Sequence, residues 1–194
     1  WCNMCRNSHI RLALSGRSSK SFLVEPEYEQ LLQGMKQGDF LLIGFGHNDE
    51  KMEEQRHTAG RGGYMDDGSF ANSLYVNYYL KAKEAGCTTI ICTPVVRRTP
   101  DGKWSSDMLH ITSDQDKFVG GDYPDAIRTM GSELNIPLVD MTAVTKELYD
   151  KMGPDKTAKL HAWPSDKVSS VDNTHTNIWG GRVNAYLCLN EIKK

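Results

Sequence analysis

The ten residues FLLIGFGHND (Phe40–Asp49) decide the fold, because they join an apolar run directly to a polar turn. Residues 40–45 have the length and composition of a strand that is covered on both faces of a sheet. Gly46-His47-Asn48-Asp49 follows without a break. The stretch therefore predicts a buried strand whose carboxyl end carries polar side chains.

Strand and helix patterns alternate on both sides of this stretch. Further strands are predicted at 10–14, 88–93 and 136–140, and helices at 26–35, 70–85, 123–134, 142–152 and 177–192. Four strands that alternate with helices predict an α/β protein with a parallel sheet sandwiched between helices. In such sheets, ligands bind beyond the carboxyl ends of the strands.

The amino-acid composition argues against two kinds of binding partner, nucleic acids and membranes. The 194 residues fit one domain, and the net charge of -2 gives no sign of the clustered basic face that nucleic-acid binding needs. No apolar run approaches the roughly 20 residues of a membrane span. We therefore expect neither a nucleic-acid nor a membrane partner. The sequence leaves cytoplasmic and secreted locations open and does not specify an oligomeric state.

The cysteines and histidines do not indicate a metal or cofactor. Trp1-Cys2-Asn3-Met4-Cys5 has the W-C-x-x-C spacing of a redox site, but no strand precedes it, so we interpret the cysteines as free thiols. Cys87 and Cys92 do not supply the second pair that a zinc site would need. Four histidines lie outside the motifs described below, and they are not spaced like the ligands of a metal site: His9, His57, His110 and His161.

Three polar segments carry candidate chemistry. Asp172 and His175 are three residues apart, so the carboxylate can bind one ring nitrogen and leave the other as a general base. The Asn48 amide and the backbone N–H of Gly16 can both donate to a developing oxyanion. Base, orienting carboxylate and oxyanion donors are the components of acyl transfer.

Each segment also has an ordinary structural interpretation. Asp172 could cap the final helix, and Gly46–Asp49 could be a plain turn after a strand. Ser18, Ser19 and Ser21 are more typical of turn residues than of nucleophiles. The combination of the three segments in this order favours catalysis.

The order Gly16, then Gly46-x-Asn48-Asp49, then Asp172-x-x-His175 resembles blocks II, III and V of the SGNH hydrolases. Residues 16–22, 45–49 and 172–175 are similar to the rhamnogalacturonan acetylesterase group of carbohydrate esterases. The resemblance implies a flavodoxin-like, three-layer α/β/α fold with a central parallel sheet and no cofactor or metal. It implies His175 as base, Asp172 as its partner, and Gly16 and Asn48 as oxyanion hole. It also implies removal of acetyl groups from pectin, rhamnogalacturonan or xylan through an acyl-enzyme.

The family's block I, Gly-Asp-Ser, has no counterpart. That block supplies the nucleophilic serine and a third oxyanion donor, yet only fifteen residues precede Gly16. We expect residues 1–194 to be a single, N-terminally incomplete SGNH hydrolase-like domain that lacks the first strand, with a central sheet position unfilled or substituted. Completion by a partner chain is one alternative. Recruitment of another serine is the other, the candidates being Ser8, Ser15, Ser18, Ser19 and Ser21.

The loops at 50–68 and 97–121 and the stretch 160–163 are expected to form the walls of a carbohydrate cleft. Side chains in them that suit a sugar ring or a uronate carboxylate are Trp104, Trp163, Arg97 and Arg98. Two other functions remain open: an inactive SGNH-fold protein that binds glycans, and a lipase or thioesterase of the same superfamily. The latter would need an exposed apolar groove.

Overall fold

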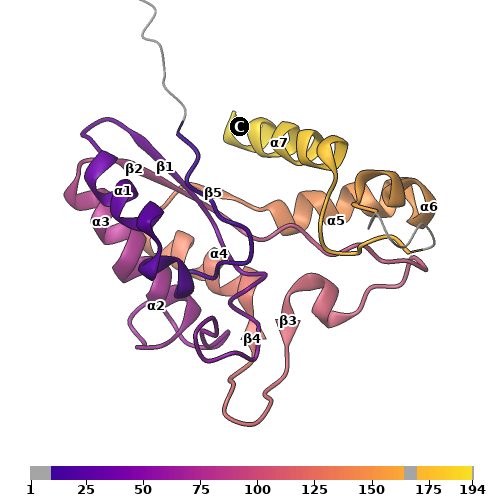
Figure 1. Cartoon of the computed structure of the whole chain (residues 1–194), viewed down its shortest axis with the longest axis horizontal. Helices are drawn as coiled ribbons and strands as arrows, with labels where there is room; N and C mark the ends of the chain where they lie inside the picture. Colours follow the sequence, from indigo (N-terminus) through magenta and orange to yellow (C-terminus); the bar gives the residue numbers. More distant parts are fainter. Residues whose placement is uncertain (1–9, 164–169, 194) are drawn as a thin grey trace, which may run out of the picture.

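The computed structural model describes residues 10–163 and 170–193 and has a three-stranded parallel sheet with helices on both faces (Figure 1). The strands are β1 (Phe40–Gly44), β2 (Thr88–Cys92) and β5 (Leu138–Val139), in the order β1-β2-β5. In the β1–β2 pair the register runs from Phe40↔Thr88 to Gly44↔Cys92. The predicted α/β class with a parallel sheet is confirmed.

All of the predicted helices are present. The 70–85 helix contains a π-helical turn, η2, between α2 and α3, and the later helices begin at side-chain caps such as Asp122, Asp140 and Asn177. The 3-10 turns, α6 and the pair β3–β4 are each two to four residues long. The bounds are α1 (Pro26–Gly34), α2 (Phe70–Leu74), η2 (Tyr75–Tyr79), α3 (Leu80–Glu84), α4 (Tyr123–Leu134), α5 (Met141–Met152), α6 (Pro154–Thr157), α7 (Ile178–Ile192), the 3-10 turns η1 (Ser21–Val24), η3 (Ser106–Leu109) and η4 (Ala158–Leu160), and the antiparallel pair β3 (Ile111–Thr112) and β4 (Gly121–Asp122).

One face of the sheet carries the main core. Helices α1, α2 and α4, together with η2, form one core with the side chains of Ile43 and Ile91, which are 4% and 1% exposed. The helices contribute buried aromatic and aliphatic side chains, among them Phe70, Tyr78 and Ile127. This cluster is the largest apolar core of the described residues and fixes the positions of β1 and β2.

The opposite face is covered only in part. Helices α5 and α7 pack against Ile90, Cys92 and Val139. The parallel register places Leu42 beside Ile90 on this face, yet Leu42 is 52% exposed and Phe40 is 72% exposed. The prediction that strand 40–45 is covered on both faces is therefore wrong, because no described helix lies over β1 on this side.

The predicted strand at 10–14 is also wrong. These residues have no strand pairing, although the Leu12 and Leu14 side chains pack against the main core. The sheet therefore has three strands instead of four, and within residues 10–163 and 170–193 the outer edge of β1 has no partner strand. The outer side of α7 is apolar as well, with Trp179 and Tyr186 each about two-thirds exposed. None of the described helices is long and apolar enough to cross a membrane.

Substitutions at two adjacent residues of β1 test whether only one face of this strand is buried. Ile43→Ala should lower the free energy of unfolding by about 2–4 kcal/mol, because it opens a cavity in the main core. Leu42→Ala should cost less than about 1 kcal/mol, because that side chain is already half in solvent. Urea unfolding of both variants measures the difference. Equal losses would show that the Leu42 face of the sheet is covered in solution.

Candidate active site

A hollow of about 750 Å³ lies at the carboxyl ends of β1 and β2. The three polar segments of the sequence meet there: 14–17, 44–48 and 174–176 all contribute to its lining. Gly16, Asn48 and His175 line this hollow together, although they are far apart in the chain. We call it the main hollow.

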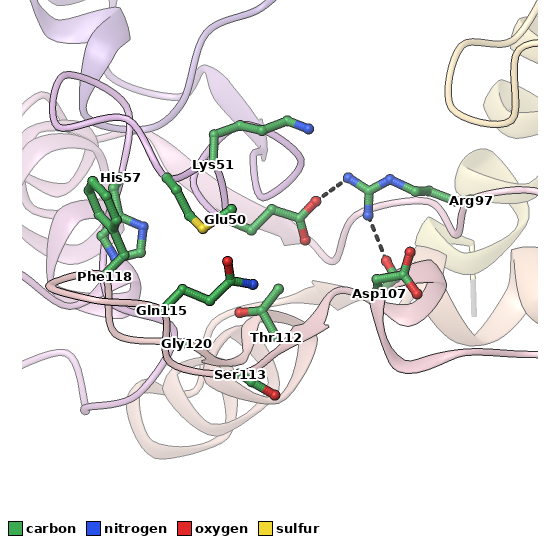
Figure 2. A pocket seen from close by; sticks show the side chains of 11 residues that line it. Glu50, Lys51, His57, Arg97, Asp107, Thr112, Ser113, Gln115, Phe118 and Gly120 are labelled. Atoms are coloured by element: carbon green, nitrogen blue, oxygen red, sulfur yellow. Dashed lines mark hydrogen bonds and ion pairs between the residues drawn. The ribbon is translucent and has the colours of Figure 1, made fainter.

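A second, smaller hollow of about 250 Å³ adjoins the main one (Figure 2). Lys51 and Arg97 line both. The loop after β1 forms one wall, and the segment around β3 and β4 forms the other. The expectation that loops 50–68 and 97–121 enclose a cleft agrees with this arrangement.

His175 and Asp172 form a hydrogen-bonded pair. The His175 Nδ1 atom lies 2.7 Å from Oδ2 of Asp172, and the backbone N–H groups of Thr174 and His175 donate to Oδ1 at 2.7 and 2.9 Å. An ionised carboxylate only accepts, so Nδ1 carries the proton and Nε2 is left as an acceptor. Burial opposes ionisation of Asp172, but these hydrogen bonds favour it, and the net effect lowers its pKa below the ordinary value.

The segment before α7 holds this pair in place. Asn177, and not Asp172, is the N-cap of α7, where its Oδ1 accepts from the N–H groups of Trp179 and Gly180. The capping interpretation of Asp172 is therefore wrong. The His175 side chain is 69% exposed, and its Nε2 has no hydrogen-bond partner in the described part of the chain. Nε2 is thus free to take a proton from a group in the main hollow.

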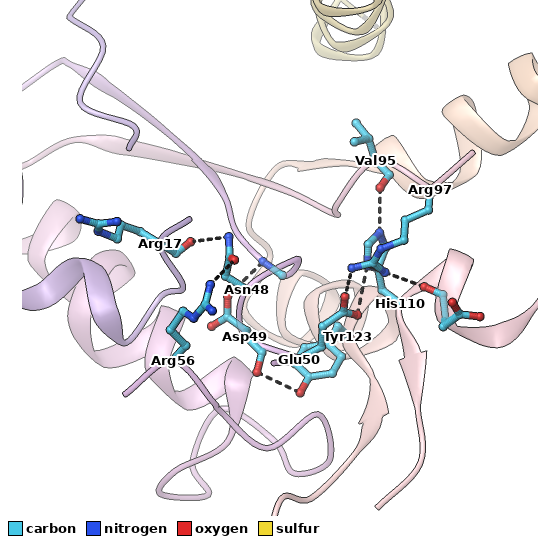
Figure 3. A network of polar contacts seen from close by, with 11 residues as sticks. Arg17, Asn48, Asp49, Glu50, Arg56, Val95, Arg97, His110 and Tyr123 are labelled. Carbon is cyan, nitrogen blue, oxygen red and sulfur yellow. Dashed lines mark hydrogen bonds and ion pairs between the residues drawn. The ribbon is translucent and has the colours of Figure 1, made fainter. Parts of the chain in front are cut away.

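Arg56 fixes the orientation of Asn48, a role that sequence reasoning did not find (Figure 3). Its Nη1 donates to Oδ1 of Asn48 at 3.0 Å and reaches the carbonyl oxygen of Gly16 at 3.5 Å. Glu53 binds the same guanidinium. With Oδ1 of Asn48 engaged by Arg56, its amide Nδ2 donates one hydrogen to the Arg17 carbonyl at 3.3 Å, and the second hydrogen has no partner among the described residues.

Asp49 lies beneath the main hollow and is completely buried. Its carboxylate accepts from the N–H and hydroxyl of Ser19 at 3.0 and 2.5 Å, from the Thr58 hydroxyl at 3.1 Å and from the Gly46 N–H at 3.1 Å. The carboxylate therefore ties the Gly16 loop to the turn after β1. Burial raises the pKa of Asp49 to about 7, although the hydrogen bonds act in the opposite direction.

The candidate serines have different environments. Ser18 and Ser19 are completely buried; Ser18 bonds Ser21, and Ser19 bonds Asp49. Ser15 is exposed and lines the main hollow, but no hydrogen bond joins it to His175 in the described residues. Ser8 and the Trp1–Cys5 motif lie outside the described residues.

A second polar network borders both hollows. Arg97 forms an ion pair with Glu50, and the buried His110 ring has Nδ1 3.2 Å from Oε2 of Glu50. The opposite nitrogen, Nε2, donates to the Val95 carbonyl at 2.7 Å. His47 packs against this ring, and burial together with the charges of His110 and Arg97 holds the pKa of His47 well below its ordinary value. His47 is therefore uncharged at neutral pH.

Three of the four side chains expected to contact sugar already have hydrogen-bond or ion-pair partners within the protein. Arg97 is paired with Glu50, and Arg98 donates to Asn173 and to the Pro154 carbonyl. Trp104 donates to Asp150. The fourth, Trp163, is half exposed and is not among the residues that line either hollow.

Comparison with known proteins places the chain in a family. No family model matches it. It is 30% identical over 188 residues to the rhamnogalacturonan acetylesterase RhgT of Bacillus subtilis (strain 168), covering 94% of this chain and 72% of that protein. The chain belongs to the rhamnogalacturonan acetylesterase family of SGNH hydrolases. The family predicted from the three motifs is thereby confirmed.

Other relatives of this family member support the same placement. A rhamnogalacturonan acetylesterase of Emericella nidulans is 26% identical over 195 residues, covering 93% of this chain and 71% of the relative. Among solved structures, YxiM of Bacillus subtilis has a TM-score of 0.69 at 21% identity, covering 94% of this chain and 44% of its own. An acetylxylan esterase of Geobacillus stearothermophilus, Axe2, has a TM-score of 0.60 at 20% identity, with 93% and 69% covered. These structures share the fold.

The raised pKa of Asp49 predicts a pH-dependent stability. Between about pH 4, the ordinary carboxyl pKa, and pH 7, the folded state holds a proton that the unfolded state has lost, so stability falls as pH rises. The stability advantage of the wild type over Asp49→Asn should therefore shrink across this window, by up to about 4 kcal/mol. Urea unfolding at pH 4.5 and pH 8 measures it. An advantage that grows with pH would contradict the assignment.

Proposed function

We propose that this protein is a serine-type acetylesterase that removes acetyl groups from plant cell-wall polysaccharide or oligosaccharide through an acyl-enzyme. One observation carries the proposal: the Nε2 atom of His175, oriented by Asp172, is free on the same hollow that Asn48 and Gly16 line. The proposed general base and the proposed oxyanion donors thus line one and the same space.

In the proposed reaction, a serine hydroxyl attacks the acetyl carbonyl carbon while Nε2 of His175 takes its proton. The carbonyl oxygen becomes negative and is stabilised by the free amide hydrogen of Asn48 and the N–H of Gly16. The C–O bond to the sugar then breaks, and His175 returns the proton to the sugar oxygen. Water attacks the acetyl-serine in the same way and releases acetate.

Asp172 and Arg56 act by positioning. Asp172 holds the proton on Nδ1 of His175 and stabilises the imidazolium that forms when Nε2 accepts a proton. Arg56, held by Glu53, fixes the amide of Asn48 so that its donor is ready before the charge develops. A preorganised donor of this kind does not need to be reoriented during the reaction.

The substrate class is supported by the relatives and by the lining of the site. Two similar proteins carry the name rhamnogalacturonan acetylesterase, and a third with the same fold is an acetylxylan esterase. The lining of the main hollow combines the cationic side chains of Arg17, Lys51, Arg56 and Arg97 with apolar ones such as Leu14, Phe45 and Met141. Four cationic side chains around this space suit a polar substrate better than a long acyl chain, so together with the relatives they favour an acetylated carbohydrate over the substrate of a lipase or thioesterase.

We further propose that a strand from outside residues 1–194 pairs with the outer edge of β1 and supplies the nucleophilic serine. The edge of β1 is unpaired in the described structure, and the carboxyl end of a parallel strand there would lie at the main hollow. A helix following that strand would cover Phe40 and Leu42 and contact the apolar outer side of α7. Such a strand and helix would complete the single domain.

Acetate release tests the proposed function. The product of the complete open reading frame should release acetate from acetylated rhamnogalacturonan oligosaccharides. His175→Ala should abolish the reaction, by roughly four orders of magnitude or more. Asn48→Ala should lower kcat by about 10²- to 10³-fold, because one oxyanion donor is lost. The exposed Lys36→Met, at the opposite end of β1, is the control and should retain wild-type activity.

Two outcomes would contradict these proposals. If the complete product binds the oligosaccharide but releases no acetate, the protein is a glycan-binding member of the family and not an esterase. If residues 1–194 alone release acetate, and Ser15→Ala abolishes that release, the nucleophile lies within this chain and the additional strand does not supply it.

A further inference from the structure

The two hollows meet at Lys51. It directly follows the Glu50 that binds Arg97, and its side chain lines both spaces. In Figure 2 the Lys51 side chain extends across the upper side of the second hollow, with its ammonium on the Arg97 side. A group that spans both hollows would lie beside Lys51 and Arg97, the two residues that line both.

Lys51 is the cation that the site leaves uncompensated. Four cationic side chains line the main hollow, and no carboxylate does. Three of the four are ion-paired: Arg17 with Glu25, Arg56 with Glu53, and Arg97 with Glu50. In residues 10–163 and 170–193, the ammonium of Lys51 makes neither an ion pair nor a hydrogen bond, and the side chain is exposed. Within the lining of the main hollow, Lys51 is therefore the cationic side chain whose charge no ion pair neutralises in the described residues.

The second hollow has the composition of a sugar site. Thr112, Ser113 and Gln115 offer hydroxyl and amide groups, and Phe118 offers an apolar ring. Neutral polar groups beside an aromatic ring suit a sugar, which has hydroxyls at its edge and C–H groups on its faces. One carboxylate that is not ion-paired, Asp107, also lines this hollow, and it accepts from the Ser105 hydroxyl at 2.5 Å.

We propose that the second hollow binds the sugar next to the acetylated one, and that Lys51 determines specificity by pairing with the carboxylate of a uronate in the substrate chain. This inference rests on the proposed function, and it distinguishes an acidic, rhamnogalacturonan-type substrate from a neutral xylan-type one. Arg97 is not available for that role. Withdrawing it would leave the buried carboxylate of Glu50 without its cation, which is strongly unfavourable. Lys51 has no ion pair or side-chain hydrogen bond to give up in the part of the chain that the structure describes.

Binding to matched oligosaccharides tests the inference. The probes are an acetylated rhamnogalacturonan oligosaccharide and the same compound with its carboxyl groups reduced to alcohols. His175→Ala is used as the background so that the acetyl groups persist, and calorimetric titration gives Kd. The background protein should bind the acidic probe more tightly, by roughly 2- to 5-fold, as expected for one exposed ion pair.

Three substitutions in that background separate charge from structure. Lys51→Met keeps the length of the side chain and should remove the preference for the acidic probe without changing Kd for the reduced one. Lys51→Arg should restore the preference. Lys36→Met removes the same charge from the opposite end of β1 and should leave both affinities unchanged.

Failure of the inference and failure of the proposed function give different results. Equal affinity for the two probes, or equal weakening of both by Lys51→Met, overturns the role of Lys51 while acetate release by the complete protein still supports an acetylesterase. Absence of binding to either probe, together with absence of acetate release, overturns both.

Discussion

The buried carboxylate of Asp49 is the interaction on which the site depends. It accepts hydrogen bonds from Ser19 and Gly46, so it joins the loop that presents Gly16 to the turn that presents Asn48. A buried carboxylate with no cation beside it is costly unless its oxygens are satisfied, and here every donor comes from the two segments it joins or from Thr58. The loop that carries Gly16 and the turn that carries Asn48 are therefore tied together through one carboxylate.

Two core tyrosines hold the loop and the turn that Asp49 joins against the core. The hydroxyl of Tyr78 donates to the Ser19 carbonyl at 2.7 Å, and the hydroxyl of Tyr123 donates to the carbonyls of Asp49 and Thr58 at 3.3 and 2.8 Å. Both tyrosines belong to helical elements that pack on the main core face. Packing in the core is thus transmitted to the site loops by three hydrogen bonds, while His175 stands on a separate, more exposed segment. The segments that carry the proposed oxyanion donors are thus anchored to the core, and the proposed base is exposed.

Sequence patterns predicted the helices, the parallel sheet and the family, because these depend on local periodicity and on short motifs. They failed where strand pairing or burial depends on neighbouring parts of the fold. The strand predicted at 10–14 has no pairing, and among the described helices none covers Leu42 of β1. Arg56 was missed for the same reason, since nothing in its loop shows that it reaches Asn48. Gly16, Asn48 and His175 do share one hollow, with Asp172 behind His175; their catalytic roles stay a prediction.

Covalent labelling with a fluorophosphonate tests the central claim most directly, because this reagent traps a serine only when a general base and an oxyanion hole act on it. The product of the complete open reading frame should gain one phosphonyl group, which peptide mass spectrometry should locate on a single serine. His175→Ala should abolish the labelling. Labelling of equal extent in the wild type and in His175→Ala, or none in either, would contradict a His175-activated serine at the main hollow.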